Sequence, residues 1–174
     1  MKLIQVTDLH LLRPGLGLLG IDPKARLEAC IEDINRHHED AALCIFTGDL
    51  TDRGEPEAFA LLGEVLAKLK LPYRLLLGNH DDRPSFLAAF PEAERDGAGF
   101  VQARISLEGR ELLLLDTHEP GQGAGTYCAQ RCAWLRNALV DCEDRPVYIF
   151  MHHPPFDIGL PCMDRLKLSD DKAF

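Results

Sequence analysis

Short apolar runs that each end in polar residues are the feature of this sequence that most constrains its fold. In the first half of the chain these runs alternate with segments whose apolar residues recur at helical spacing. Strands and helices that alternate with short links indicate a parallel sheet covered by helices. The chain has 174 residues, enough for one domain with a core. We therefore expect an α/β fold in a single domain over residues 1–174.

The first half is expected to contain three strands and two helices. The strands are apolar runs of strand length, at residues 2–7, 42–46 and 72–77. Asp22 is a predicted N-cap and Pro23 the first helical residue, and this helix extends to about His37. A second helix is expected over residues 56–69.

The second half has a different pattern. Residues 100–106 and 111–116 predict an antiparallel hairpin, because a short polar turn joins two strand-like runs. A helix is expected over residues 130–140, and residues 146–151 predict another buried strand. The final segment, 156–174, has no clear period, so we expect neither helix nor strand there.

Four of the expected strands are followed by side chains that can bind a metal ion. These residues are Asp8, His10, Asp49, Asn79, His80 and His152. In open α/β sheets, ligands bind beyond the carboxyl ends of the strands. We therefore expect these side chains to converge, although they are far apart in the sequence. Their oxygen and nitrogen atoms suit hard to borderline cations.

Two of the motifs are weak when taken alone. Asp8 and His10 are two residues apart, so on an extended segment both side chains point to one face and could chelate one cation. A strand-end turn with a capping aspartate is the alternative. Asp49 follows Gly48, a pair that is often a turn. Its carboxylate could also bridge two ions about 3.5–4 Å apart.

The third and fourth motifs are more informative. In the Gly-Asn-His-Asp segment after the third strand, an asparagine turn would explain Asn79 but not His80. Asn79 offers an amide oxygen, and His80 offers a positive or proton-donating group beside a bound phosphate. His152 and His153 are neighbours and would face opposite sides of a strand. We choose His152 as the ligand and regard His153 as a packed or supporting histidine.

Together these motifs resemble the calcineurin-like metallophosphoesterases, within the class III cyclic nucleotide phosphodiesterase and glycerophosphodiesterase branch. The resemblance is carried, in order, by T-D-L-H, F-T-G-D-L-T-D, G-N-H-D-D and M-H-H-P-P, and it extends over essentially the whole chain. It implies a four-layer αββα sandwich. It also implies hydrolysis of small phosphodiesters, namely 3′,5′-cyclic nucleotides or glycerophosphodiesters.

The resemblance further implies a centre of two divalent or trivalent metal ions, drawn from Fe, Mn, Zn and Co. Asp8, His10 and Asp49 are the implied ligands of the first ion, and Asp49 also reaches the second. Asn79 and His152 are the other implied ligands of the second ion. A metal-bridging hydroxide would attack phosphorus, while the implied catalytic residue His80 would stabilise charge on the phosphoryl oxygens.

The sequence departs from the family pattern at its end. The family has a fifth motif, G-H-x-H, whose histidines complete both ions, and this sequence does not contain it. His37 and His38 lie on an expected helix and His118 follows a hairpin strand, so none of them can replace it. We expect the chain to be a piece of a longer enzyme that lacks the C-terminal strands of the sandwich. We also expect weakened metal binding, and therefore low or absent activity.

The composition of the chain restricts the kinds of molecule that it is expected to bind. The formal net charge of −9 and the absence of a basic stripe argue against binding to nucleic-acid polymers and favour a small-molecule substrate. No apolar run reaches the ~20 residues of a membrane span, and the N-terminus enters a strand directly, so we expect a cytoplasmic protein.

The six cysteines form no C-x-x-C pair and are expected to be free thiols. A homodimer would suit the family, but no sequence feature marks an interface.

Two other functions stay open at this point. A phosphomonoesterase or a nucleotide pyrophosphatase of the same fold would use the same residues on another substrate. A catalytically impaired protein that binds metal or serves as a scaffold would explain the missing motif.

Overall fold

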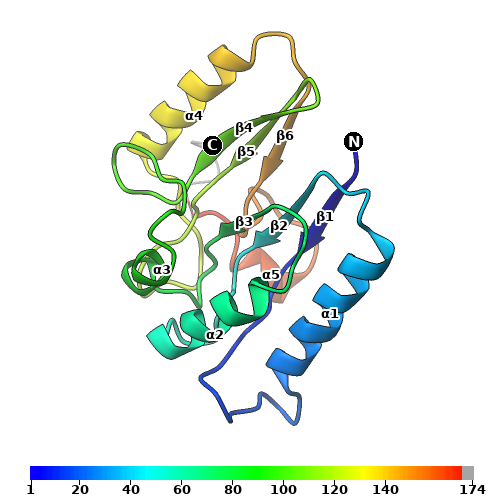
Figure 1. Cartoon of the computed structure of the whole chain (residues 1–174). Coiled ribbons are helices and arrows are strands. Elements are labelled where there is room, and N and C mark those ends of the chain that lie inside the picture. Colours follow the sequence, from blue (N-terminus) through cyan, green and yellow to red (C-terminus); the bar gives the residue numbers. More distant parts are fainter. Residues whose placement is uncertain (170–174) are drawn as a thin grey trace. The chain divides into compact units, whose positions relative to one another are not determined.

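The computed structural model describes residues 1–169, which form two compact units with the elements labelled in Figure 1. Unit 1 contains residues 1–75 and 80–93, and unit 2 contains residues 76–79 and 94–169. Within the described part of the chain, no helix is both long enough and apolar enough to cross a membrane. The α/β fold expected from the sequence is confirmed.

The first sheet, built almost entirely from unit 1, has the strand order β1-β2-β3. These strands are β1 (Leu3–Val6), β2 (Leu43–Thr47) and β3 (Tyr73–Leu76). β1 and β2 are parallel, with Leu3 opposite Leu43 and Val6 opposite Phe46. The alternation of strands and helices along the sequence predicted this parallel pairing. The helices of this unit, within the described residues, are α1 (Pro23–His37), α2 (Pro56–Leu66) and α3 (Arg83–Ala89).

α1 begins and ends where the sequence predicts. Its N-cap is Asp22, whose side chain accepts a hydrogen bond of 3.1 Å from the backbone N–H of Ala25. Leu27, Ile31 and Ile34 are buried along one face of this helix. α2 ends three residues earlier than expected, at Leu66 rather than Leu69.

α3 was missed in the sequence, although its signals are there. Asp82 is its N-cap and accepts a hydrogen bond of 2.8 Å from the N–H of Ser85. Pro84 lies in the first turn, a position that proline favours. At seven residues the helix is too short to show a helical repeat of apolar side chains.

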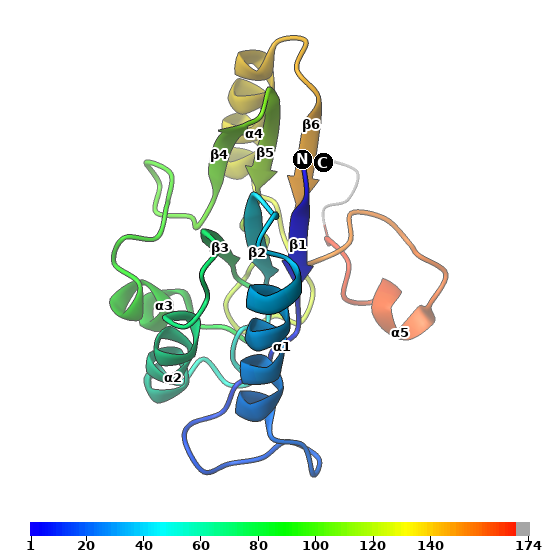
Figure 2. The same ribbon diagram turned by 45° about the vertical axis from the view of Figure 1, so that its right-hand side comes forward.

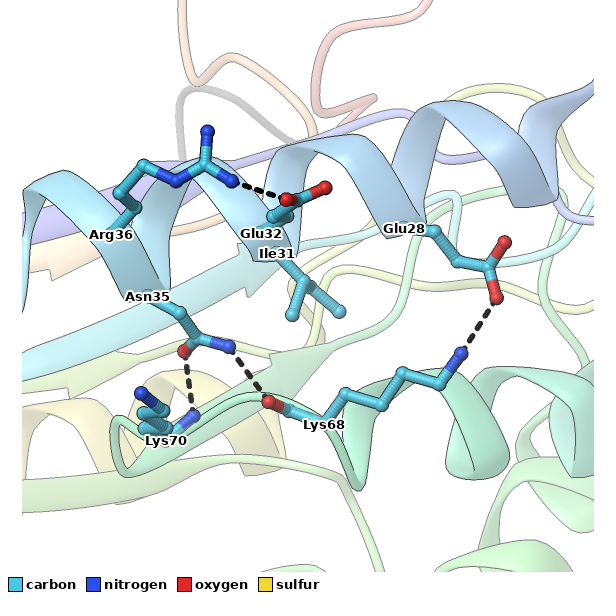
Figure 3. A pocket seen from close by; sticks show the side chains of 7 residues that line it. All are labelled: Glu28, Ile31, Glu32, Asn35, Arg36, Lys68 and Lys70. Carbon is cyan, nitrogen blue, oxygen red and sulfur yellow. Dashed lines mark hydrogen bonds and ion pairs between the residues drawn. The ribbon is translucent and has the colours of Figure 1, made fainter.

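Figure 3 shows how α1 is attached to the segment that precedes β3. The Asn35 amide donates a hydrogen bond of 2.8 Å to the Lys68 carbonyl and accepts one of 2.9 Å from the Lys70 N–H. The Lys68 ammonium group donates to Glu28 at 2.8 Å. The pocket between these residues is therefore a structural junction in which these charged side chains and the amide already bind one another.

Unit 2 contains the sheet β4-β5-β6. Its described elements are β4 (Ala103–Leu107), β5 (Arg110–Leu114), β6 (Val147–Phe150), α4 (Ala129–Cys142) and α5 (Pro161–Asp164). β4 and β5 form the expected antiparallel hairpin, and β5 and β6 are parallel. At the turn, Glu108 and Gly109 have φ of 48° and 73°, the left-handed pair that a tight two-residue hairpin requires.

α4 lies along the sheet β4-β5-β6 in both views (Figures 1 and 2). Leu113 and Leu115 pack with Cys132 and Leu135 in the buried core between helix and sheet. The prediction that β6 is a buried strand is wrong, because Tyr148 and Ile149 are 44% and 42% exposed. In the described sheet β6 is an edge strand that pairs with β5 alone.

The final segment also differs from expectation. Residues Pro161–Asp164 form the short helix α5, where no helix was predicted. Residues 170–174, which belong to the same expected segment, lie outside the described residues. All six cysteines lie within the described chain and are free thiols, as predicted.

A buried carboxylate holds one side of the second sheet together. Glu111 is fully buried on β5 and lies 2.9 Å from Nε of Arg104 and 2.5 Å from Nη1 of Arg145. The Ser106 hydroxyl donates to the same carboxylate at 2.9 Å. The hydrogen bond from Arg104 is the largest of the interactions that lower the pKa of Glu111 below its ordinary value of 4.5.

We expect Glu111→Gln to lower the thermal unfolding temperature at neutral pH by several degrees. A carboxyl group with a lowered pKa in the folded state stabilises the fold fully above its unfolded pKa, and this contribution disappears as the pH falls through the folded pKa. The variant lacks this contribution, so its stability should fall less than that of the unchanged chain between about pH 5 and about pH 3. Thermal scans at several pH values measure both effects.

Glu64→Gln, which changes an exposed carboxylate on α2, is the matched control. It should leave the unfolding temperature and its pH dependence nearly unchanged. Equal behaviour of the two variants would contradict a stabilising role of Glu111.

Candidate metal centre

Three of the predicted ligands lie on left-handed backbone directly after β1 and β2. Asp8, His10 and Asp49 have φ of 57°, 45° and 47°. Each such residue costs about 1–3 kcal/mol, and residues of this kind cluster at functional sites. The prediction that Asp8 and His10 lie on an extended segment is wrong, because the chain turns left-handed at both.

Backbone hydrogen bonds between two loop segments hold this conformation. The Asp8 N–H donates to the backbone carbonyl of Gly48 at 3.1 Å, and the His10 N–H donates to the backbone carbonyl of Asp49 at 2.9 Å. Further along, the Leu11 N–H donates to the carbonyl of Leu50 at 3.1 Å. The loop after β1 therefore runs beside the loop after β2 and continues the pairing of the two strands.

The side chains of these three residues converge within unit 1. His10 Nε2 lies 3.8 Å from Asp8 Oδ1 and 3.6 Å from Asp49 Oδ2. Atoms that bind one ion at about 2.0–2.2 Å lie roughly 3–4 Å from one another. The imidazole of His10 therefore lies at ligand spacing from each of the two carboxylates, and all three side chains are of a donor type that binds such a cation.

His80 lies against the same group. Its backbone N–H donates to Asp49 Oδ1 at 2.9 Å, and its ring packs edge-on against His10 with 4.7 Å between ring centroids. His80 Nδ1 lies 2.8 Å from the carbonyl oxygen of Asp52. Because a carbonyl only accepts, Nδ1 carries the proton, and in the neutral ring the lone pair is then on Nε2. His10, Asp49 and His80 thus offer three ligand-type atoms within 4.8 Å of one another.

Asp52 also lies beside His10, although it was not among the site residues predicted from the sequence. Its Oδ1 lies 3.2 Å from His10 Nδ1, on the side of the ring away from Asp8 and Asp49. A carboxylate at this nitrogen orients a metal-binding histidine and raises its basicity. The signal was present, because Asp52 is the last residue of the F-T-G-D-L-T-D motif.

Asp81 stabilises the segment of chain that carries Asp49. Its buried carboxylate accepts hydrogen bonds from the N–H of Leu50 at 3.1 Å, the N–H of Thr51 at 2.9 Å and the Thr51 hydroxyl at 2.9 Å. These bonds fix the segment that follows Asp49. Gly54 lies in the same loop at φ 66°, where a Cβ would be only 2.6 Å from Cβ of Asp82.

The other predicted ligands, Asn79 and His152, belong to unit 2. His152 Nε2 lies 3.3 Å from Asn79 Oδ1, again within the spacing of two ligands of one cation. His153 is buried, and its Nδ1 lies 2.7 Å from the Thr117 hydroxyl, with Gly125 against its ring. A packed His153 beside a partly exposed His152 agrees with the choice of His152 as the ligand.

The predicted site residues thus form two groups, one in each unit. Asp8, His10, Asp49 and His80 come together in unit 1, and Asn79 lies beside His152 in unit 2. The polypeptide joins the groups directly, because Asn79 and His80 are consecutive residues. Each group by itself has donor atoms that suit a borderline cation.

The chain belongs to the calcineurin-like phosphoesterase family, whose model matches residues 1–173. It is 42% identical, over 99% of its length, to a probable cyclic nucleotide phosphodiesterase of Rhodopseudomonas palustris, and covers 64% of that protein. It is 31% identical over 94% of its length to the glycerophosphodiester phosphodiesterase GpdQ of Enterobacter lignolyticus and covers 60% of it. The chain therefore spans somewhat less than two thirds of the length of these curated relatives.

A solved structure agrees at the level of the fold. The crystal structure of the phosphopantetheinyl hydrolase PptH from Mycobacterium tuberculosis matches 98% of this chain and 76% of its own, with a TM-score of 0.52. The sequence identity is 12%, so this likeness shows the fold alone. The calcineurin-like fold that the motifs implied is confirmed.

We expect Asp81→Asn to destabilise unit 1. The amide places a donor group where one carboxylate oxygen accepts from the N–H of Leu50 or Thr51. Loss of such a charge-assisted bond costs roughly 1.5–3 kcal/mol. Urea unfolding measures this loss, and Asp144→Asn, on an exposed turn, is the control that should change stability by less than about 0.5 kcal/mol. An Asp81 variant as stable as the control would contradict this role.

Proposed function

We propose that this chain carries the catalytic residues of a metal-dependent phosphodiesterase that hydrolyses small phosphodiesters. The observation that carries the proposal is the convergence of Asp8, His10 and Asp49 on strained backbone. Backbone strain kept at three neighbouring metal-ligand side chains indicates a functional site. Because the family model extends through both units, we treat residues 1–174 as a single catalytic domain.

The proposed centre holds two metal ions of the Fe, Mn, Zn or Co type. Asp8, His10 and Asp49 would hold the first ion, and Asp49, Asn79 and His152 would hold the second. The geometry within unit 1 supports the first set, and the closeness of Asn79 to His152 supports part of the second. When bound, such ions polarise the phosphoryl oxygens and supply a nucleophile at neutral pH.

His80 is the proposed catalytic residue. The Asp52 carbonyl fixes its Nδ1–H, and the His80 N–H binds Asp49, so the ring is held in one orientation. In the protonated ring Nε2–H can donate to a phosphoryl oxygen and stabilise the charge that develops there. This interaction requires no covalent bond between enzyme and phosphate.

Small diesters are the proposed substrates because relatives are named for them. The Rhodopseudomonas palustris relative is named a probable cyclic nucleotide phosphodiesterase, and the Enterobacter lignolyticus relative a glycerophosphodiester phosphodiesterase. The net charge of −9 favours small substrates over nucleic-acid polymers. The cytoplasmic location and the homodimer stay predictions.

We expect the chain to hydrolyse bis(p-nitrophenyl) phosphate or 3′,5′-cyclic AMP at a low rate when Mn²⁺ is saturating, because a high concentration of the ion offsets the weak metal binding expected without the G-H-x-H motif. Asn79→Ala removes one ligand of the second ion and should weaken metal binding at least about 10–100-fold, since even indirect ligand supports contribute this much. Hydrolysis rates measured across a Mn²⁺ titration test this. Asn137→Ala, on the exposed face of α4, is the matched control and should behave like the unchanged chain.

Three results would contradict the proposal. They are the absence of Mn²⁺-dependent hydrolysis, an Asn79 variant with an unchanged Mn²⁺ requirement, and faster hydrolysis of p-nitrophenyl phosphate than of the diesters. The last result would indicate a phosphomonoesterase.

A further inference from the structure

A cavity of about 380 Å³ adjoins the first proposed metal site within unit 1. Asp8 and His10 form part of its wall, so the cavity is continuous with the side chains that would hold the ion. Its volume lies in the range of about 300–1,000 Å³ that small-molecule sites occupy. A group attached to a phosphate at Asp8 and His10 could therefore extend into this cavity.

The outer wall of the cavity is a tight apolar turn. Leu18 and Ile21 exchange backbone hydrogen bonds of 2.9 and 2.8 Å, with Leu19 and Gly20 at the tip. Leu19 has a left-handed φ of 49° and is 95% exposed, although it lines the cavity. A leucine held at this conformation in water contributes neither to the core nor to an ordinary turn, for which asparagine or glycine is favoured.

The side chains that line the cavity favour an apolar ring over a polar glycerol group as the part of the substrate bound there. Leu27 and Cys30 of α1 form another wall, and Arg26 and His10 are the basic residues among those that line the cavity. The hydroxyl groups of glycerol would lose water here and find few partners, which costs free energy. A flat ring would instead bury apolar surface against leucine and isoleucine.

We infer that this cavity binds a flat ring, aryl or nucleobase, carried by an ester group of a phosphodiester whose phosphate lies at Asp8 and His10. The inference rests on the proposed function and names its substrate class, ring-bearing rather than polyol diesters. Leu18, Leu19 and Ile21 are then residues that determine specificity.

The first test compares two diesters with the same leaving group. Bis(p-nitrophenyl) phosphate carries a second ring, and methyl p-nitrophenyl phosphate carries a methyl group in its place. We expect Leu18→Ser to lower the ratio of their kcat/KM values about tenfold, because a lost apolar contact reduces discrimination by this order. Leu16→Ser is the matched control, since Leu16 is in the same loop but does not line this cavity, and it should leave the ratio unchanged.

The second test needs no turnover. Cys30 lines the cavity and is half-buried, and this burial raises the pKa of its thiol. With Mn²⁺ present, phenylphosphonate at about ten times its dissociation constant should slow alkylation of Cys30 by iodoacetamide about tenfold. Methylphosphonate at the same degree of saturation has the same charged group without the ring and should slow it much less. Cys162 is exposed and serves as the internal control, read by peptide mass spectrometry.

The outcomes separate this inference from the proposed function. Hydrolysis of both diesters with a ratio that Leu18→Ser does not change would overturn the cavity assignment alone. Equal protection of Cys30 by the two phosphonates would overturn it as well. If neither diester is hydrolysed, the proposed function fails, and the protection of Cys30 still decides whether the cavity binds a ring.

Discussion

The left-handed backbone at Asp8, His10 and Asp49 is the constraint on which the proposed site depends. The three residues together store several kcal/mol of strain at about 1–3 kcal/mol each. Hydrogen bonds from Asp8, His10 and Leu11 to residues 48–50 balance this cost, and the buried Asp81 carboxylate holds the second segment in place. If these bonds were lost, the loops would relax and the three side chains would separate.

The Gly-Asn-His-Asp segment combines support and chemistry in consecutive residues. His80 faces Asp49 and Asp52, whereas Asp81 binds the backbone of Leu50 and Thr51. In the proposed site His80 is thus available to a substrate, while its neighbour Asp81 fixes the loop that carries Asp49. This arrangement prepares the donor atoms before an ion or a phosphate arrives, which is the main source of electrostatic catalysis in enzymes.

The sequence predicts the parts of this molecule that local pattern controls. Apolar runs of strand length predicted β1, β2 and β3, the Asp22 cap predicted the start of α1, and the polar residues after the strands indicated the candidate site. α3 was missed because a seven-residue helix shows no apolar repeat. β6 was wrongly expected to be buried, because an apolar strand has the same sequence pattern at the edge of a sheet as in its centre.

The finer geometry of the site could not be predicted from the sequence. Asp and His adopt left-handed backbone more often than most residues do, but still uncommonly, so their presence does not predict it at Asp8 or His10. Tertiary hydrogen bonds impose this conformation. The position of Asp52 behind His10 depends on how two loops align, although the motif that contains it is visible. The apolar cavity was not predicted either, because it combines residues of β1, the following loop and α1.

The most direct test of the proposed site is anomalous X-ray scattering from crystals of the chain grown with Mn²⁺. We predict an anomalous peak within about 2.0–2.3 Å of Asp8 Oδ1, His10 Nε2 and Asp49 Oδ2. Crystals of the Asp49→Asn variant should show a weaker peak or none. A map with Mn²⁺ bound elsewhere, or with no ion among these three atoms at saturating Mn²⁺, would contradict a metal centre at this position.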